Sequence, residues 1–364
     1  MLNGKGHLGL ATLACVGLAI AISTPAAAWD RGSVENHYLP AGQPMVEGLA
    51  IDSKGNIYTP TFNPKGSPPA QLFTFDSSGN VKNQVSIQNS SSAMLGLAFR
   101  PKTDALLVID FGASQVLSVN PMNGKSVVCI TLPSGSRANA GLNALTFDAA
   151  GNVYVSDSFQ GIIWRFSPGN NGNACGEASA WVTDPLLLPN RPASDPNQEP
   201  QNVPPFGANG IEFNHAQNAM FVCNTAIDSI VEIRVSGAGT ANPTAGSLTV
   251  LTNSINGCDG IAIDANNNIW AAANQADEMV VIDPTGKVIA KLGDFDGVNG
   301  GMTKGLLFPA SPAFSPVDGS LWVTNLELDL TSIGLTQAVD SQWAAEVTQH
   351  SIAKIQVPAT FPAF

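Results

Sequence analysis

A short strand-like motif recurs six times along the chain, at intervals of about 50 residues. The copies read EGLAID, LGLAFR, NALTFD, NGIEFN, DGIAID and ASPAFS, and they begin at Glu47, Leu95, Asn143, Asn209, Asp259 and Ala310. The successive spacings are 48, 48, 66, 50 and 51 residues. A regular internal repeat of this length is typical of architectures in which like units pack in series.

Each unit contains more than one strand. The motif is followed by a turn and by a second strand with a large apolar residue near its centre: Tyr58, Leu107, Tyr154, Phe221, Trp270 and Trp322. Several turns carry Gly-Asn or a run of Asn, which suits positive φ. Third strands follow in five units, and fourth strands in several. Four strands per repeat predict one β-propeller blade, so six copies predict an all-β, six-bladed propeller.

The same repeat disfavours other folds and predicts how the ring closes. A β-sandwich and a parallel α/β barrel are alternatives, but residues 335–349 are the only stretch with a helical pattern. The sixth unit lacks an outer strand of its own. Residues 33–39 (SVENHYL) are predicted to supply that strand and protect the open edge. Residues 29–364 are thus predicted to form a single domain.

Residues 1–28 have the pattern of a secretory signal peptide. Lys5 precedes an apolar run over residues 8–22, and Ala26 to Ala28 form a small-residue cleavage site. A membrane anchor is the alternative, but the run is short for a span and a processing signal follows it. An exported protein is expected, periplasmic or secreted after cleavage near Ala28, with no membrane attachment once processed.

The net charge disfavours some classes of binding partner, and the cysteines bear on the cellular compartment. The chain has 28 acidic and 16 basic residues, for a net charge of -12, which argues against nucleic acid or anionic lipid as a partner. Four cysteines lie beyond the signal peptide, and no Cys-x-x-Cys occurs. They allow three pairings in an oxidising compartment. Their places in neighbouring blades favour Cys129–Cys175 and Cys223–Cys258.

The first residue of each motif copy is predicted to lie in a ring. The first strand of every propeller blade lines the central channel, so Glu47, Leu95, Asn143, Asn209, Asp259 and Ala310 should surround one axis. Two buried carboxylates repel one another unless a cation or a proton compensates. Carboxylate and amide oxygens together favour a hard cation such as Ca²⁺, whereas zinc and copper prefer His or Cys. A purely structural polar ring is the alternative.

These residues resemble the gluconolactonase family, which includes senescence marker protein, and are similar to diisopropyl fluorophosphatase and the paraoxonases. The likeness rests on an acid-Gly pair in blade one, Asn in blade three, Asn-Gly in blade four and Asp-Gly in blade five. It implies a calcium-dependent hydrolase of lactones, esters or phosphotriesters. By the same resemblance Glu47, Asn143, Asn209 and Asp259 would bind calcium, and Asp259 would be the nucleophile or general base.

The chain also departs from that family. Gly141 stands where gluconolactonases have an arginine that contacts polar substrate. His37, His215 and His350 are expected at the surface, unlike the catalytic histidines of paraoxonases. Both departures disfavour a sugar lactone and leave the hydrolase class open.

Long loops are expected over the ligand side of the propeller. Residues 184–208, 293–309 and 326–349 form these loops, which are candidates for lids. Their apolar side chains would make a vestibule for an apolar lactone or ester: Leu186, Leu187, Leu188, Phe206, Leu306, Leu307, Phe308 and Trp343.

Polar residues at second-strand ends are further candidates for the site. Asp110, Asp157, Asn224 and Asn325 would either contact substrate, orient ligands or cap the strands. A small-molecule substrate is expected, and no protein partner is indicated. A binding propeller with a structural metal and a strictosidine synthase-like enzyme are the rival interpretations, since fold alone does not fix function.

Overall fold

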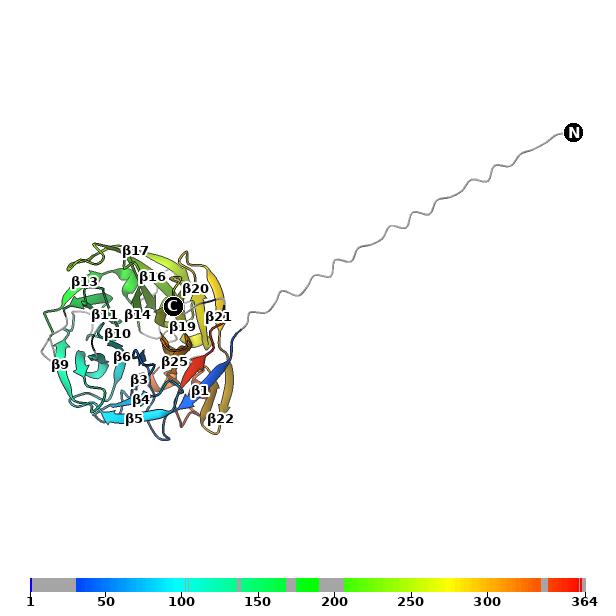
Figure 1. The fold of residues 1–364 in the computed structure, drawn as a ribbon, viewed down its shortest axis with the longest axis horizontal. Coiled ribbons are helices and arrows are strands. Elements are labelled where there is room, and N and C mark those ends of the chain that lie inside the picture. Colours follow the sequence, from blue (N-terminus) through cyan, green and yellow to red (C-terminus); the bar gives the residue numbers. More distant parts are fainter. Residues whose placement is uncertain are drawn as a thin grey trace.

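The computed structural model describes residues 1, 31–101, 103, 105–135, 139–167, 175–189, 206–334, 340–359 and 361. Six four-stranded antiparallel sheets surround a central axis (Figure 1), which confirms the predicted six-bladed propeller. Residues 2–30, which hold nearly all of the predicted signal peptide, lie outside the described residues. No helix in the described part of the chain has the length and apolarity needed to cross a membrane.

The blades follow the repeat in chain order. Blade one comprises β2 (Ala50–Ile51), β3 (Ile57–Pro60), β4 (Gln71–Phe75) and β5 (Val81–Ser86), and blade two comprises β6 (Met94–Phe99), β7 (Leu106–Asp110), β8 (Gln115–Val119) and β9 (Ser126–Thr131). Blade three comprises β10 (Leu142–Phe147), β11 (Val153–Asp157), β12 (Ile162–Phe166) and β13 (Ser179–Thr183), and blade four comprises β14 (Ala208–Phe213), β15 (Ala219–Asn224), β16 (Ser229–Ser236) and β17 (Thr244–Asn253). Blade five comprises β18 (Cys258–Ile263), β19 (Ile269–Ala273), β20 (Glu278–Ile282) and β21 (Val288–Leu292).

Blade six is closed by both ends of the domain. It comprises β24 (Pro309–Phe314), β25 (Leu321–Asn325), β26 (Ser351–Ile355) and the N-terminal β1 (Val34–Tyr38). β1 pairs antiparallel with β26, from Val34 opposite Ile355 to Tyr38 opposite Ser351. The predicted closing strand is therefore confirmed.

In three blades the turn after the first strand is fixed by one carboxylate. In blade five the Asp264 carboxylate accepts hydrogen bonds from the Asn268 backbone, the Asn268 side chain and Trp270 Nε1. Asp52 and Asp148 make the corresponding bonds in blades one and three. One carboxylate thus fixes the turn and satisfies the polar atom of the large residue on the second strand, which packs between neighbouring sheets.

Two of the expected elements differ in the structure. The predicted helix over residues 335–349 reduces to α1 (Ser341–Ala344) within its described part, residues 340–349, because Asp340 adopts a left-handed conformation and its side chain does not cap the helix. Residues 335–339 lie outside the described residues. The predicted loop over residues 293–309 contains a hairpin of β22 (Phe295–Asn299) and β23 (Met302–Gly305).

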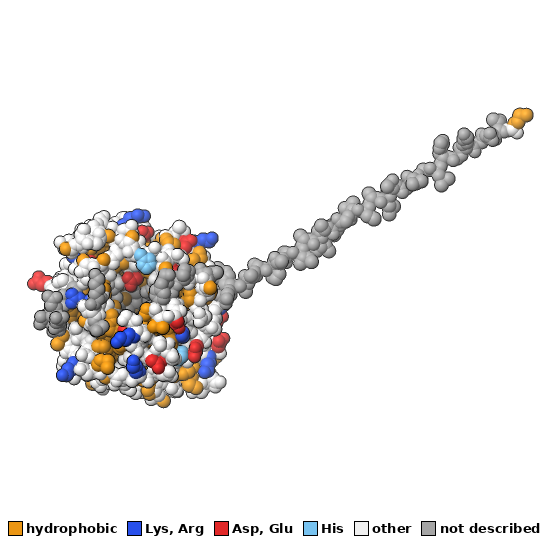
Figure 2. All heavy atoms as spheres, viewed as in Figure 1, with side chains coloured by type: hydrophobic (Ala, Val, Ile, Leu, Met, Phe, Trp, Pro, Cys, Tyr) orange, Lys and Arg blue, Asp and Glu red, His pale blue; other side chains and the backbone are white. Residues whose placement is uncertain are grey.

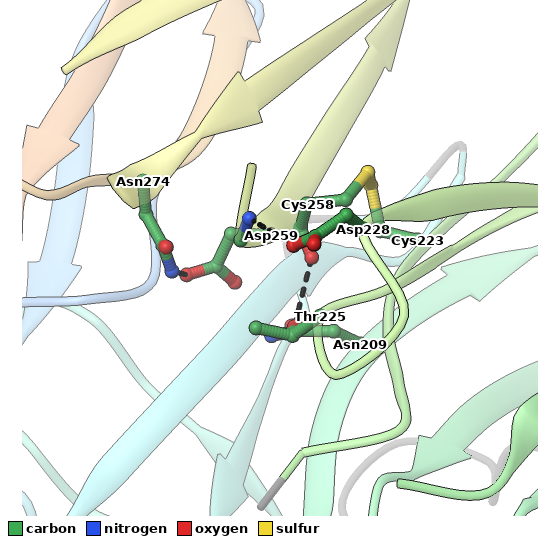
Figure 3. The surroundings of a disulfide bond; sticks show 8 residues. Asn209, Cys223, Thr225, Asp228, Cys258, Asp259 and Asn274 are labelled. Carbon is green, nitrogen blue, oxygen red and sulfur yellow. Dashed lines mark hydrogen bonds between the residues drawn. A yellow bond between two sulfur atoms is a disulfide. The ribbon is translucent and has the colours of Figure 1, made fainter. Parts of the chain in front are cut away.

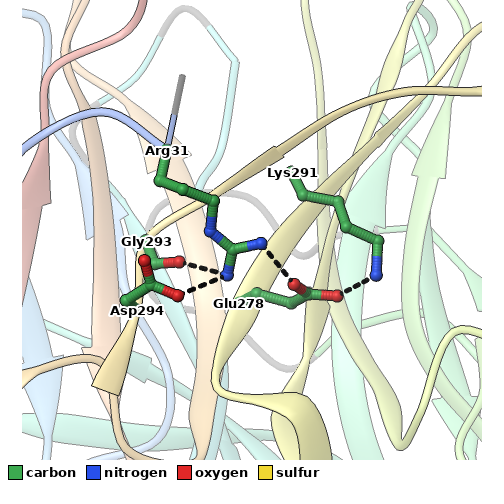
Figure 4. Close-up of polar contacts among 5 residues, drawn as sticks. All are labelled: Arg31, Glu278, Lys291, Gly293 and Asp294. Atoms are coloured by element: carbon green, nitrogen blue, oxygen red, sulfur yellow. Dashed lines mark hydrogen bonds and ion pairs between the residues drawn. The ribbon is translucent and has the colours of Figure 1, made fainter. Parts of the chain in front are cut away.

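An ionic cluster ties the start of the domain to blade five (Figure 4). Arg31 donates from Nη1 to Glu278 Oε2 at 2.8 Å, and from Nη2 to the Gly293 carbonyl at 2.6 Å and to Asp294 Oδ1 at 2.8 Å. Lys291 also contacts Glu278. The Glu278 side chain is only 8% exposed, so Arg31 offsets the cost of holding that charge away from water.

Arg31→Ala is expected to lower the free energy of unfolding by about 1–3 kcal/mol, because it leaves a buried carboxylate with one cation fewer and frees the closing strand. Urea unfolding measures this loss. Arg234→Ala is the matched control, since Arg234 lies 4.0 Å from Glu232 with 72% of its side chain exposed, and its effect should stay within about 0.5 kcal/mol. Equal losses in the two variants would contradict the role given to Arg31.

Candidate metal centre

In five of the six blades a bulge in the first strand sets the ring residue toward the axis. The register of blade five shifts between Cys258 and Ile261, so Asp259 and Gly260 are left out of the ladder. The same shift occurs at the ring residue of blades two, three, four and six. Bulges redirect side chains in this way and are common next to functional sites.

Glycine after the ring residue allows the inner strands to approach closely. A Cβ on Gly48, Gly96, Gly210 or Gly260 would lie 2.2, 2.6, 2.3 or 2.5 Å from the carbonyl oxygen of the next ring residue. No real Cβ tolerates these distances, so the glycine in four of the six motifs is a packing requirement of the ring.

Four predicted site residues line one small cavity. Glu47, Asn143, Asn209 and Asp259 surround a space of about 40 Å³ together with Leu95, and each is at most 5% exposed. Ala310, the sixth ring member, is fully buried and does not line the cavity. The remaining walls are mainly apolar side chains, called here the apolar wall: Phe62, Phe206, Phe308, Leu326, Leu328 and Leu330.

Two carboxylate oxygens in this cavity have no partner. Glu47 Oε2 and Asp259 Oδ1 are buried without a hydrogen bond to any described residue. Asp259 Oδ2 accepts from Asn274 Nδ2 at 3.0 Å, and Asn209 Nδ2 donates to Thr225 Oγ1 at 2.9 Å (Figure 3). A buried unpaired carboxylate oxygen is costly unless something else binds it.

Burial makes both carboxylates resist ionisation. It raises the pKa of Asp259 to about 6, although the amides of Asn274 and Asn209 lower it. Burial also raises the pKa of Glu47 well above its usual value, and the nearby Asp259 charge adds to that effect. The site therefore holds two acids that ionise together only at a free-energy cost, which a bound cation would remove.

The donor set fits a hard cation. Two carboxylates and two amides supply oxygen atoms, the ligands that Ca²⁺ prefers, and the two unpaired oxygens would gain a partner. Across the described residues no group of three or more His, Cys, Asp and Glu side chains is placed to hold a metal, so amide oxygens would be essential ligands. The ring contains no nitrogen or sulfur ligand of the kind that zinc favours.

The structure forms both predicted disulfides. Cys223–Cys258 joins β15 to β18 with a Cα–Cα distance of 5.2 Å (Figure 3), and Cys129–Cys175 has a Cα–Cα distance of 4.8 Å. Cys258 immediately precedes Asp259. The first bridge therefore links the strands of blades four and five beside the ring.

The four polar residues at the ends of second strands bond to neighbouring loops and do not line the cavity. Asp157 accepts from the backbone of Gly141 and Gln160 and from Trp164 Nε1. Asp110 accepts from Ser91 and Ala113 in the same manner. None of Asp110, Asp157, Asn224 and Asn325 lines the cavity.

The two asparagines in this set also bond to backbone groups. Asn224 donates to the carbonyls of Leu186 and Leu188 at 2.8 and 3.0 Å. Asn325 accepts from the Leu307 backbone and donates to the Gly305 carbonyl. Their observed role is to fix the connections between neighbouring blades.

Thr225 and Asn274 also line the cavity, although the repeated motif does not single them out. Both come directly after a second strand, one position beyond Asn224 and Ala273. Phe62 and Leu326 occupy the same place in blades one and six. Aligning the residue after each second strand would have revealed this second ring from the repeat alone.

All three histidines were expected at the surface, but two of them are largely buried. The His37 side chain is 12% exposed and its ring lies 4.9 Å from that of Trp322, because β1 packs against blade six. His350 is 15% exposed, and its Nδ1 lies 2.6 Å from Oε2 of the buried Glu327. His215 is exposed, as predicted, and its Nε2 lies 2.8 Å from the Asp264 carbonyl.

The predicted vestibule is only partly correct. Phe206 and Phe308 line the cavity, but Leu187 packs in the core between blades three and four, and Leu306 packs in that between blades five and six. Trp343 contacts Phe295 of the hairpin instead. The segment after β25 supplies Leu326, Leu328 and Leu330 in their place.

Aromatic rings occupy the place of the missing arginine. A Cβ on Gly141 would lie 2.5 Å from the ring of Phe159, so no larger side chain fits there as the chain is folded. The rings of Phe62, Phe111, Phe159 and Phe206 follow one another with centroid distances of 6.1, 5.9 and 5.5 Å. This aromatic arc, defined by those four residues, adjoins the cavity through Phe62 and Phe206.

A larger cavity of about 450 Å³ lies further along the inner strands. It is lined by Gly96, Gly210 and Gly260 and by residues that follow them, with Glu212 as its one acid. Glu212 Oε1 accepts from Thr146 Oγ1 at 2.8 Å and from the Phe213 backbone. None of the four oxygen-bearing ring residues lines it, so the smaller cavity is the candidate site.

Figure 2 shows the surface on the side seen in Figure 1. Lys and Arg side chains there are scattered among acidic and apolar ones, and they do not gather into a basic patch. This face thus offers no concentrated positive charge.

The fold and the ring together define a six-bladed propeller with an oxygen-lined site in its channel. Residues 202–293 match the family model described as SMP-30/Gluconolactonase/LRE-like region. The matched segment includes Asn209, Asp259 and the Cys223–Cys258 disulfide, and it confirms the family resemblance seen in the motifs. No curated protein matches the chain at the level of sequence.

Solved structures share the fold at low identity. A gluconolactonase from Xanthomonas campestris has a TM-score of 0.57 at 11% identity, over 92% of this chain and 99% of that one. Regucalcin from Agrobacterium tumefaciens, a calcium-binding protein, has a TM-score of 0.54 at 16% identity, over 88% and 93%. A streptogramin B lyase has a TM-score of 0.55 at 13% identity, over 92% and 100%. These likenesses establish the fold and do not choose a reaction.

Proposed function

We propose that this protein is an exported, calcium-dependent hydrolase of an apolar lactone or ester. The observation that carries the proposal is the pair of unpaired carboxylate oxygens, Glu47 Oε2 and Asp259 Oδ1, in a cavity that also holds Asn143 and Asn209. The family match supports a lactonase-type hydrolase at the level of the family. The calcium-binding neighbour supports the choice of metal.

Each ring residue has a distinct task in this proposal. Glu47 and Asp259 would balance the charge of the cation, and the amide oxygens of Asn143 and Asn209 would complete its oxygen ligands. Bound calcium would supply Lewis-acid polarisation of the substrate carbonyl. As general base, Asp259 would take a proton from water while the water oxygen bonds to the carbonyl carbon, and would return it to the leaving alkoxide. As nucleophile, its carboxylate would instead attack that carbon and expel the alkoxide, and water would then hydrolyse the resulting acyl anhydride to release the acid and restore Asp259.

Substrate entry requires the apolar wall to move. A cavity of about 40 Å³ holds an ion and little else, whereas ligand pockets are typically about 300–1,000 Å³. Leu326, Leu328 and Leu330 belong to one segment after β25, which is tied to β26 through the contacts of Glu327 with His350 and Ser351. Displacement of this segment would join the cavity to the face where the loops lie.

The aromatic arc favours an apolar acyl group over a sugar. The hydroxyl groups of a sugar substrate would lie against aromatic rings where the family has an arginine. Buried hydroxyl groups without hydrogen-bond partners are disfavoured. An alkyl or aryl chain would gain contact with Phe159 and Phe206.

A substrate panel tests the proposed function. Alkyl-substituted lactones, gluconolactone, aryl esters and phosphotriesters would be assayed with calcium and after chelation. Calcium-dependent turnover of an alkyl lactone or aryl ester is expected. The hydrolase proposal fails if no substrate turns over and chelation changes only the melting temperature.

That second outcome would support a non-catalytic propeller with a structural metal. The small volume of the cavity, about 40 Å³, is the observation that favours it. Its ligand would then bind elsewhere on the propeller, and calcium would act on stability alone.

Phe159→Ala is expected to lower kcat/KM for the best alkyl lactone roughly tenfold, because one wall of the acyl pocket is lost. The value for a short unsubstituted lactone should change little, since that substrate does not reach the arc. Phe99→Ala, which removes a half-buried ring beside the larger cavity, is the control. Equal losses for long and short substrates would argue against the arc as a specificity element.

Export is part of the same proposal. The two disulfides between neighbouring parts of the propeller suit an oxidising compartment. The N-terminal pattern supports the same location. Fractionation of the host cells, with mass determination of the mature N-terminus, would check it.

A further inference from the structure

Asn274 contacts the proposed metal site without belonging to its ring. It opens the short 3-10 helix η3 (Asn274–Ala276) directly after β19, and the residue is 3% exposed. It lines the cavity, and its Nδ2 donates to Asp259 Oδ2 at 3.0 Å. No ring prediction or family motif accounts for this residue.

The backbone that carries Asp259 is fixed from several sides. Asp228 Oδ1 accepts from the Gly257 backbone at 2.9 Å, and Thr225 Oγ1 donates to the Cys258 carbonyl at 2.8 Å. The disulfide to Cys223 holds Cys258 as well (Figure 3). Rotation of its own side chain is thus the main freedom left to Asp259.

The position of Asn274 is itself specified by Gly257. The Asn274 backbone N–H donates to the Gly257 carbonyl at 3.2 Å. Gly257 has φ +62°, and a Cβ there would lie 1.9 Å from Asn274 Oδ1. Glycine thus supplies both the left-handed turn and the space for the amide.

We propose that Asn274 is a positioning residue that holds one oxygen of Asp259, so that the other remains free for the cation in the cavity. Asn274 and Asn209 lie on opposite sides of the Asp259 carboxylate (Figure 3). The bond from Asn274 engages Oδ2, and Oδ1 is left without a partner among the described residues. This inference rests on the proposed calcium site and assigns a residue that tunes it.

Calcium titration and terbium luminescence of the full mature protein test the inference. Asn274→Ala should weaken calcium binding about 10–100-fold, as is usual when a residue that orients a metal ligand is lost. Bound Tb³⁺ should also show a shorter emission lifetime in H₂O relative to D₂O, because water replaces the misplaced carboxylate oxygen. Asn274→Ser keeps a hydroxyl donor and should recover part of both quantities.

Asn268→Ala is the matched control. Asn268 belongs to the same blade, is 7% exposed and donates from Nδ2 to Asp264 Oδ2 at 2.8 Å, so it forms the same kind of pair at the other end of the sheet. It should lower stability and leave the calcium affinity and the terbium lifetimes unchanged.

The outcomes separate this inference from the proposed function. Calcium binding by the wild type with unchanged affinity and lifetimes in Asn274→Ala would overturn the role of Asn274 and leave the metal site standing. Equal weakening by Asn268→Ala would overturn it too, because general loosening of blade five would then explain the loss. Absence of calcium and terbium binding in the wild type would overturn the metal site and the inference together.

Discussion

Asp259→Asn is expected to reduce turnover by about 10²-fold or more even when calcium saturates the protein. The amide keeps the shape of the side chain and one oxygen ligand, so the site can still fill at high calcium. It cannot accept the proton from water or attack a carbonyl carbon, and loss of general-base catalysis typically costs 10²–10⁴-fold. Calorimetry of calcium binding beside turnover of the best panel substrate separates the two effects.

Asn143→Asp supplies the contrast to that variant. It adds a third carboxylate to the ring and leaves Asp259 unchanged, so calcium affinity should rise. Turnover should change less than in Asp259→Asn, through the weaker Lewis acidity of a more neutralised ion. Recovery of nearly full activity by Asp259→Asn in excess calcium would show that Asp259 is only a ligand.

The ring could be predicted because its geometry follows from the repeat. Each motif begins at the same point of its first strand, and the first strands line one channel, so residues more than 200 positions apart, such as Glu47 and Asp259, had to converge. The turn chemistry of Asp52, Asp148 and Asp264 is equally local, since each carboxylate bonds within six residues of itself. Repeats and local turn motifs of this kind can be recognised in a single sequence.

Features set by contacts between units could not be predicted in the same way. The apolar wall draws on segments after several different strands, and no periodicity marks which leucines of a long loop turn inward. His350 is half-buried because it packs against Glu327. That partner lies 23 positions away on another segment, so no local pattern indicates the contact. The repeat places Asn274 in the second ring, but its bond to Asp259 is a contact that no sequence pattern indicates.

Metal-free protein is expected to become more stable on acidification from pH 7.5 to 5. The pKa of Asp259 is about 6 in the fold, and that of Glu47 is also raised, whereas both fall near 4 in an unfolded chain. The folded state therefore binds more protons across this window, and its stability falls as pH rises through it. At about 1.4 kcal/mol for each pKa unit, the part of the Asp259 shift that lies between pH 6 and 5 contributes about 1.4 kcal/mol.

Calcium should reverse that slope. Cation binding requires both carboxylates ionised, so the added stability is present above about pH 6 and is lost as protons compete at lower pH. Urea unfolding at pH 5 and 7.5, with calcium and after its removal by chelation and gel filtration, measures all four values. The double variant Glu47→Gln, Asp259→Asn lacks both acids and serves as the control.

The comparison with that variant isolates the ring from other buried acids. Asp277, whose pKa burial raises to about 7, and Glu212, whose pKa burial also raises, favour the same acid-side stability in wild type and variant alike. The difference between the two proteins therefore reports Glu47 and Asp259 alone. Identical pH slopes for metal-free wild type and double variant would mean that the two carboxylates do not strain each other in the channel, and the main physical reason for placing a cation there would be gone.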